Sequence, residues 1–181
     1  DPKTYNISVT ALSEKLKIAE KKGILPKILV PVHFGGLPCN MSAIKNLSKK
    51  YGFKIIEDAS HAIGASYNQS KIGSCIFSDI TVFSFHPVKI ITTGEGGMIT
   101  TNDKKVFSKL IQLRTHGITN DKSFMQETPK DELWNYQQIA LGFNYRMNDI
   151  EAALGISQMK KVDSFVQKRN KIAKFYENNL D

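Results

Sequence analysis

Short runs of β-branched and aromatic residues alternate with helical segments along the chain, and this alternation limits its fold more than any other feature. The runs lie at 27–33 (KILVPVH), 53–57 (FKIIE), 79–85 (DITVFSF) and 97–101 (GMITT). Runs of this kind are typical of strands buried on both faces, as in parallel sheets. The pattern predicts an α/β fold with a mostly parallel sheet flanked by helices.

Helices are expected between and after these strands. Ser8 is in position to cap a helix that continues to about Lys22 and is stopped by Gly23. Further helices are predicted at 41–51, 106–114, 148–160 and 163–178. The polar segment 119–135 lacks a clear period, so a long loop is expected there.

The composition favours one packed domain without a membrane helix or a metal site. The chain has 181 residues, of which 41% are hydrophobic, and this suffices for one domain of ordinary size. No run approaches the roughly 20 apolar residues of a membrane helix, and the polar N-terminus does not resemble a signal peptide. Cys39 and Cys75 lie far apart, so we expect buried, reduced thiols of a cytoplasmic protein rather than metal ligands.

The net charge of +8 does not by itself predict a nucleic-acid partner. The lysines recur through the predicted helices and are not interleaved with aromatic residues. A solvated helix face is the simple interpretation, and attraction of an anionic ligand is the alternative. We therefore expect neither a nucleic acid nor a membrane as a partner.

Two side chains at predicted strand ends can carry chemistry. Asp58 directly follows the strand 53–57, and Lys89 lies just beyond the strand 79–85, before the glycine-rich segment 92–97 (TTGEGG). Ligands of α/β sheets bind outside the carboxyl ends of the strands. A lysine, a carboxylate and a phosphate-binding turn are the groups that pyridoxal 5'-phosphate (PLP) requires. Taken alone, however, Asp58 is equally well a helix cap, and a lone lysine after a strand, such as Lys89, is usually a surface side chain.

Four segments taken together resemble the sugar-nucleotide aminotransferases of PLP fold type I. They are 57–64 (EDASHAIG), 83–89 (FSFHPVK), 92–97 (TTGEGG) and 144–163 (NYRMNDIEAALGISQMKKVD), in the order and rough spacing of that family. The resemblance extends over essentially the whole chain. It implies an enzyme that uses PLP to transfer an amino group to the keto carbon of a nucleotide-linked sugar, for amino sugar biosynthesis.

The resemblance also implies roles for single residues. Lys89 stands at the position of the lysine that forms a Schiff base with PLP. Asp58 stands at the position of the carboxylate that pairs with the pyridinium nitrogen. His61 matches the residue beside the cofactor ring and its 3′-oxygen, and Ser84 matches the serine that hydrogen-bonds the phosphate.

A homodimer with shared active sites is a further implication. Asn144 and Arg146 match residues that family dimers contribute across the interface, the asparagine towards the neighbour's phosphate. The chain 1–181 is expected to be the central part of the PLP-binding large domain. Relatives also have an N-terminal phosphate loop with a ring-stacking aromatic residue and a C-terminal small domain, and neither is recognisable in this sequence. The chain alone is expected to be inactive.

Three segments indicate a narrower likeness within the family. The segments 33–41 (HFGGLPCNM), 84–97 (SFHPVKIITTGEGG) and 114–118 (RTHGI) resemble the transaminases that form UDP-4-amino-4,6-dideoxy-N-acetyl-altrosamine in pseudaminic acid biosynthesis. Those enzymes use glutamate as amino donor. The likeness implies a UDP-linked 4-keto-6-deoxy sugar as substrate, although these motifs shape mainly the cofactor site.

A dehydratase, a PLP-binding regulator and a dehydrogenase are the alternatives to an aminotransferase. PLP-dependent sugar dehydratases have a histidine in place of the Schiff-base lysine, so Lys89 argues against them. A non-catalytic PLP-binding regulator of the same fold stays open, although no helix-turn-helix signature is evident. A nucleotide-binding dehydrogenase is discarded, because the glycines of 94–97 lead into a strand and no Gly-x-Gly-x-x-Gly follows a first strand.

Overall fold

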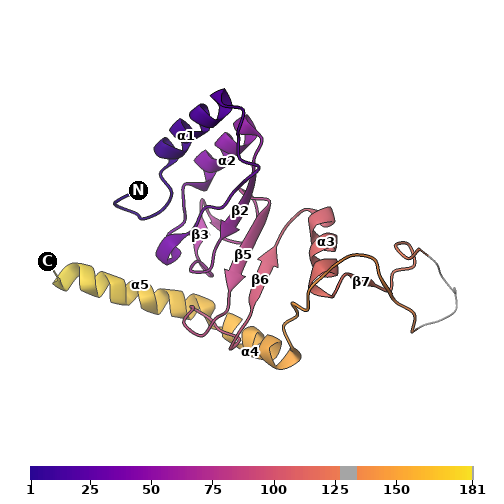
Figure 1. Ribbon diagram of the computed structural model, residues 1–181. Coiled ribbons are helices and arrows are strands. Elements are labelled where there is room, and N and C mark those ends of the chain that lie inside the picture. The colour runs from indigo at the N-terminus through magenta and orange to yellow at the C-terminus, as the bar shows by residue number, and fades with distance from the viewer. Residues whose placement is uncertain (127–133, 181) are drawn as a thin grey trace. The chain divides into compact units, whose positions relative to one another are not determined.

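The computed structural model describes residues 1–126 and 134–180. They form two compact units, one made of Asp1–Asn102 with Asp149–Asp181 and the other of Asp103–Asn148. The first unit contains the main sheet and most helices, and the second contains one helix and a short hairpin (Figure 1).

The main sheet of the first unit has the strand order β1-β2-β5-β6. Its strands are β1 (Ile28–Leu29), β2 (Lys54–Asp58), β5 (Ile80–Ser84) and β6 (Gly97–Thr100). β1, β2 and β5 run parallel, whereas β6 is antiparallel to β5. The predicted α/β class with a mostly parallel sheet is confirmed.

The strand predicted at 27–33 is shorter in the structure. β1 covers only Ile28–Leu29, and Val32 then forms an isolated parallel bridge to Asp58. Pro31 stands between them and has no amide hydrogen to donate, so regular pairing is interrupted there. The Pro31 carbonyl still accepts the Asp58 amide at 2.9 Å.

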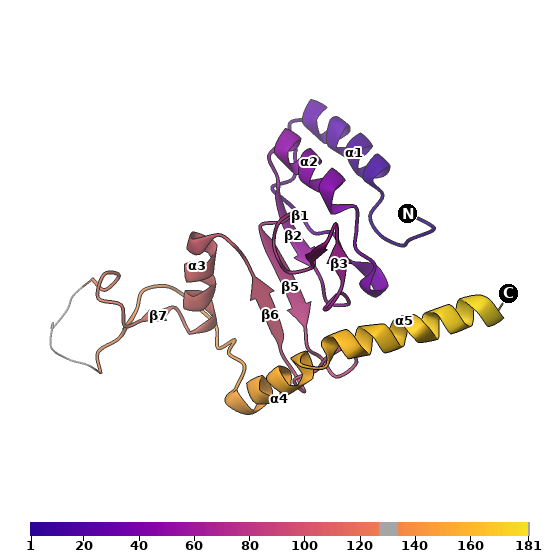
Figure 2. The same cartoon turned by 180° about the vertical axis from the view of Figure 1, so that it is seen from behind.

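Helices α1 (Val9–Lys21) and α2 (Met41–Tyr51) pack together beside the sheet, as both views show (Figures 1 and 2). The Ser8 side chain caps α1 by accepting the Ala11 amide, as predicted. Gly52 ends α2 in the left-handed conformation with φ of 79°. The helices bury one apolar cluster against the sheet, made of Leu12, Leu16, Cys39, Met41, Ile44, Tyr51, Phe53 and Ile55.

A small hairpin, β3 (Ser66–Tyr67) and β4 (Ser70–Lys71), was not predicted from the sequence. Its two turn residues, Asn68 and Gln69, both have positive φ, at 47° and 64°. Such a turn matches the twist of a tight hairpin. Glutamine is uncommon in this conformation, so the sequence carries little signal for it.

Helices α4 (Asp149–Met159) and α5 (Val162–Asn179) complete the first unit and confirm the two predicted C-terminal helices. The start of α5 lies beside the hairpin, where Lys71 Nζ and Asp163 Oδ1 form an exposed ion pair 3.2 Å apart. A Cβ on Gly64 would lie 2.9 Å from a methyl group of Val166, so α5 approaches closely there. Farther along α5, Ile172 and Phe175 are exposed.

The second unit contains α3 (Lys104–Arg114) and the antiparallel strands β7 (Ile118–Thr119) and β8 (Gln137–Gln138). α3 begins earlier than the predicted 106–114 because the Asp103 side chain accepts the Lys105 and Val106 amides. The predicted loop 119–135 lies partly outside the described residues, and its first residue belongs to β7. In the described part of the chain, no helix is long and apolar enough to cross a membrane.

Candidate active site

The carboxyl ends of β2 and β5 bring two predicted site residues to one edge of the sheet. Asp58 is the last residue of β2, and Ser84 is the last residue of β5. The strands are parallel, and Asp58 pairs with Val82, which lies on the same face as Ser84. All three side chains are half-buried. This edge is where α/β sheets bind ligands.

Lys89 and His61 lie in the turns that follow these strands. The Lys89 amide donates to the His86 carbonyl at 2.9 Å, and the Lys89 side chain is half-buried. His61 Nδ1 accepts the Gly35 amide at 3.3 Å. The Phe34 ring meets the His61 ring edge-on, with 6.1 Å between the ring centroids. The short helical turn Phe34–Gly36 therefore supports His61.

The side chains of His61 and Lys89 both affect the pKa of the Asp58 carboxyl group. Burial raises its pKa, but hydrogen bonds from Ser60 and the charges of His61 and Lys89 lower the pKa below its ordinary value. The Ser60 amide donates to Asp58 Oδ1 at 3.0 Å. Asp58 is therefore ionised at neutral pH. The structure brings Asp58, His61 and Lys89 close enough to interact electrostatically.

The glycine-rich segment 92–97 folds back on the end of β5 and holds the chain that carries Lys89. The Phe85 amide donates to the Gly96 carbonyl at 2.9 Å, and the Thr93 amide donates to the Phe85 carbonyl at 3.1 Å. α4 packs closely on this segment, because a Cβ on Gly155 would lie 2.9 Å from Thr93 Cγ2. The segment is thus fixed from two sides.

Sequence reasoning missed a buried polar network on the opposite face of β2. The Glu57 carboxylate accepts from His33 Nε2 at 2.7 Å, from Thr81 Oγ1 at 3.1 Å and from Ser78 Oγ. His33 and Thr81 are 0% exposed and Glu57 is 3% exposed. Burial raises the pKa of Glu57, but the hydrogen bonds from His33 and Ser78 lower it overall. The available sequence signal was an ionisable residue, His33 or Glu57, within each of the apolar runs 27–33 and 53–57.

The hydrogen-bond pattern assigns the tautomer of His33. The Cys39 amide donates to His33 Nδ1 at 3.1 Å, and an amide can donate only to a nitrogen without hydrogen. His33 therefore carries its hydrogen on Nε2 and donates it to Glu57. Burial lowers the pKa of His33, whereas the side chains of Cys39 and Glu57 raise it above the ordinary value. A second proton, on Nδ1, would require the Cys39 amide to turn away from that nitrogen. The observed hydrogen bond therefore corresponds to neutral His33.

Asn144 and Arg146 belong to the second unit and are both exposed. Asn144 forms an isolated antiparallel bridge with Thr115. The Tyr145 amide between them donates to the Arg114 carbonyl at 3.0 Å. These backbone contacts hold the segment against the end of α3 and leave both side chains on the surface of their unit.

α4 carries an apolar stripe, Ile150, Ala153, Leu154 and Ile156, whose residue types fit either a core or an interface. In the described residues its members are exposed: Ile150 by 84%, Ile156 by 63% and Leu154 by 41%. This stripe is therefore not part of the core of the first unit. Exposed apolar side chains in a row are typical of a surface that another protein or domain covers.

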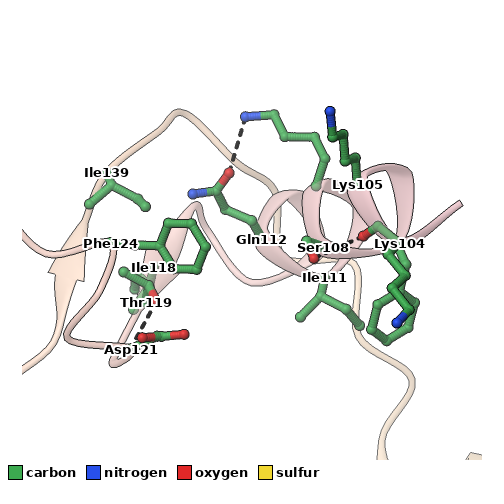
Figure 3. Close-up of a pocket in the computed structure, with 12 residues that line it drawn as sticks. Lys104, Lys105, Ser108, Ile111, Gln112, Ile118, Thr119, Asp121, Phe124 and Ile139 are labelled. Carbon is green, nitrogen blue, oxygen red and sulfur yellow. Dashed lines mark hydrogen bonds between the residues drawn. The ribbon is translucent and has the colours of Figure 1, made fainter.

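A separate hollow lies in the second unit, between α3 and the start of the hairpin (Figure 3). Ile111 and Gln112 of α3 face Ile118, Phe124 and Ile139 across it. None of the predicted site residues lines it. No group of three or more potential metal-binding His, Cys, Asp or Glu side chains occurs among residues 1–126 and 134–180.

The donor set at the sheet edge fits PLP. An amine on Lys89, a carboxylate on Asp58, an imidazole on His61 and a hydroxyl on Ser84 all lie in the first unit, at or just beyond the ends of β2 and β5. They are the kinds of group that can bind an aldehyde, a ring nitrogen, a phenolic oxygen and a phosphate.

Comparison with protein families matches residues 1–181 to the DegT/DnrJ/EryC1/StrS aminotransferase family. One similar protein is the UDP-4-amino-4,6-dideoxy-N-acetyl-beta-L-altrosamine transaminase of Campylobacter jejuni (strain 81-176). It is 45% identical over 150 residues, which are 83% of this chain and 37% of that protein. GDP-perosamine synthase of Caulobacter vibrioides is 38% identical over 180 residues, which are 99% of this chain and 43% of that protein.

Solved structures of aminotransferases share the fold. PseC of Helicobacter pylori, an aminotransferase involved in the biosynthesis of pseudoaminic acid, superposes with a TM-score of 0.82 at 33% identity. The match covers 96% of this chain and 42% of PseC. The PLP form of Spr1654 of Streptococcus pneumoniae, described as a sugar aminotransferase, gives a TM-score of 0.75 at 26% identity, over 97% of this chain and 45% of Spr1654. The chain spans less than half of each of these proteins.

Proposed function

The chain belongs to the DegT/DnrJ/EryC1/StrS aminotransferase family, and on this premise we propose that it is the cofactor-binding part of a PLP-dependent sugar-nucleotide aminotransferase. The amino donor is glutamate, and the acceptor is the keto carbon of a nucleotide-linked 4-keto-6-deoxy sugar. The family resemblance found in the sequence, including that to the altrosamine transaminases, is confirmed. The chain is then the central part of a large domain, and the complete enzyme acts in the cytoplasm.

One observation carries this proposal: Asp58 and Ser84 end the parallel strands β2 and β5, and His61 and Lys89 lie in the turns that follow these two strands. When bound, PLP supplies an electron sink for transfer of the amino group. The Lys89 amine is the group that attaches the cofactor covalently and, once released, moves a proton at the reacting carbon. The Asp58 carboxylate is ionised and holds a proton on the ring nitrogen through charge.

The remaining predicted residues orient the cofactor. His61, held by the Gly35 amide and the Phe34 ring, would orient the ring of the cofactor. Ser84, at the end of β5, would hold its phosphate by donating a hydroxyl hydrogen. Asn144 and Arg146 reach the cofactor of a second subunit in a homodimer, which is consistent with their exposure on the surface of their own unit.

The proposed substrate is a UDP-linked sugar. It is supported by the C. jejuni relative, whose name specifies a UDP-linked amino sugar. The C. vibrioides relative carries a GDP-linked name instead, so the nucleotide is the feature to test. The net charge of +8 would attract the diphosphate of either nucleotide.

The dehydratase alternative is disfavoured by Lys89, because those relatives lack the lysine. A regulator that binds PLP without turnover remains the second alternative. An aminotransferase, a dehydratase and a regulator differ in what happens to the amino donor and to the sugar. One assay of the products therefore separates the three functions.

The test uses the full-length protein with PLP, L-glutamate and either a UDP-linked or a GDP-linked 4-keto-6-deoxy sugar. We expect an amino sugar nucleotide by mass spectrometry, formed faster from the UDP substrate. D-glutamate is the control for the donor. Loss of a sugar hydroxyl without gain of nitrogen would indicate a dehydratase. Binding of PLP without any product from either sugar would indicate a regulator.

A further inference from the structure

The network around Glu57 has no role in the chemistry proposed above, although it contains ionisable side chains in the core. We propose that His33 and Glu57 are positioning residues that fix Asp58 and His61 relative to each other. The inference rests on the proposed function only in taking PLP as the group that Asp58 and His61 bind.

Glu57 holds the end of β2. It precedes Asp58 directly, and neighbouring side chains of a strand point to opposite faces. The Glu57 carboxylate is tied to Thr81, its register partner on β5, and to Ser78, which precedes β5. A rotation or shift of β2 at this point would break these buried hydrogen bonds. The direction of the Asp58 side chain is therefore fixed from the opposite face of the sheet.

His33 holds the segment that supports His61. Its backbone amide donates to the Asp58 carbonyl at 3.0 Å, so it is paired with the end of β2. Its side chain is held by Glu57 at Nε2 and by the Cys39 amide at Nδ1. The next residues are the turn Phe34–Gly36, which contacts His61.

Close packing transmits this restraint to His61. A Cβ on Gly36 would lie 2.8 Å from the His61 carbonyl oxygen, so the two backbones touch. The Gly35 amide and the Phe34 ring both contact the His61 imidazole. The His33–Glu57 pair thus joins the supports of His61 and Asp58 in one buried structure.

Stability alone does not account for such a pair. Buried ionisable pairs replaced by apolar residues of similar volume often leave stability unchanged or improved. Hydrogen bonds, unlike apolar contacts, fix direction as well as distance. A network of such directional bonds can hold the Asp58 carboxylate and the His61 imidazole in the defined geometry that a binding site needs.

The test compares variants of the full-length protein. Glu57→Gln keeps the volume but leaves one acceptor oxygen instead of two, so either His33 Nε2 or the Ser78 and Thr81 hydroxyls lose their acceptor and face an NH2 group. His33→Leu removes the hydrogen-bond donor to Glu57. His33→Gln keeps an N–H donor near the position of His33 Nε2. The control is Ser48→Ala, which removes another buried hydrogen bond, from Ser48 Oγ to the Phe53 carbonyl at 2.6 Å, before the opposite end of β2.

Hydrogen exchange of the PLP-free protein is measured together with the PLP dissociation constant and the absorption spectrum of bound PLP. We expect Glu57→Gln and His33→Leu to speed exchange in 33–36 and 58–61. We also expect them to weaken PLP binding by about 10- to 100-fold, as loss of residues that orient ligand-binding groups does in metal sites. His33→Gln should stay near the wild type. Ser48→Ala should lower the melting temperature and leave the other readings unchanged.

Equal effects of Glu57→Gln and Ser48→Ala on exchange in these segments would overturn the inference. So would His33→Gln behaving like His33→Leu, a comparison that holds even if Glu57→Gln does not fold. If the wild-type protein binds no PLP, the proposed function fails. The exchange data from PLP-free protein then still decide whether His33 and Glu57 position Asp58 and His61.

Discussion

Asp58 pairs with Val82 across the parallel strands β2 and β5. This register places the carboxylate on the same half-buried face as Ser84, which ends β5, and near the turn that carries Lys89. Residues separated by about thirty positions in the sequence thus meet at one edge of the sheet.

Lys89→Ala in the full-length protein should abolish transamination and the covalent PLP adduct that borohydride traps. The reason is that the proposed covalent link needs the Lys89 amine. The exposed lysine Lys49 on α2 provides the control, and Lys49→Ala should keep the adduct and the activity. Peptide mapping of the reduced protein locates the adduct, and an adduct on another lysine would contradict the assignment.

Asp58→Asn should leave the covalent link to PLP in place but reduce the rate by orders of magnitude. Asparagine keeps the shape and loses the charge that stabilises a protonated ring nitrogen, and each pKa unit of that coupling corresponds to about 1.4 kcal/mol. The absorption spectrum and the single-turnover rate with glutamate measure the two effects separately. A near-normal rate would mean that Asp58 acts only as a cap for the Ser60 amide.

Mixing of two inactive variants tests whether the sites are shared between subunits. One variant is Lys89→Ala, and the other is the double variant Asn144→Ala/Arg146→Ala, which we expect to be inactive as well. In a heterodimer, one site combines intact Lys89 from one chain with intact Asn144 and Arg146 from the other. Activity should therefore return, up to about half per heterodimer.

The same mixture needs proof of subunit exchange, for which differently tagged chains and native mass spectrometry suffice. No return of activity in proven heterodimers would place Asn144 and Arg146 in the site of their own subunit. The exposure of Ile150 and Ile156 on α4 leads us to expect a dimer in the first place.

Glu57 should make the stability of the protein depend on acid pH. Its pKa is lowered in the folded state, because the hydrogen bonds from His33 and Ser78 outweigh the effect of burial. The stabilisation is therefore present above the ordinary pKa of about 4.5 and is lost as the pH falls through the lower, folded-state pKa. Urea unfolding at several pH values should show the gap between wild type and Glu57→Gln narrowing on acidification. A gap independent of pH would mean that Glu57 is not ionised in the core; Glu14→Gln, on the exposed face of α1, is the control.

Gly117→Ala should destabilise the second unit far more than Gly23→Ala destabilises the first. Both glycines have similar positive φ, 70° and 67°, so the backbone cost of about 1 kcal/mol is shared. A Cβ on Gly117 would lie 1.8 Å from the Ala140 carbonyl oxygen, whereas Gly23 has nothing within 4 Å. Hydrogen exchange of the β7–β8 hairpin measures the difference, and equal effects would show that the hairpin shifts without cost.

Local patterns in the sequence were sufficient for the helices and for the class of the fold. α2 begins at Met41 and ends at Tyr51 as predicted, because the apolar period and Gly52 are encoded by neighbouring residues. The order of the motifs around Asp58 and Lys89 was also sufficient for the family, which requires no knowledge of contacts.

The tertiary structure alone decided which residues meet. His33 and Glu57 are 24 positions apart and bond only because β2 pairs in register with the chain after β1. The antiparallel direction of β6 and the pairing of β7 with β8 likewise depend on distant partners. The amino-acid sequence determined which side chains can do the chemistry, since that follows from residue type and local period. Strand register determined their mutual geometry, because hydrogen bonding between distant segments sets which face and which edge each side chain occupies.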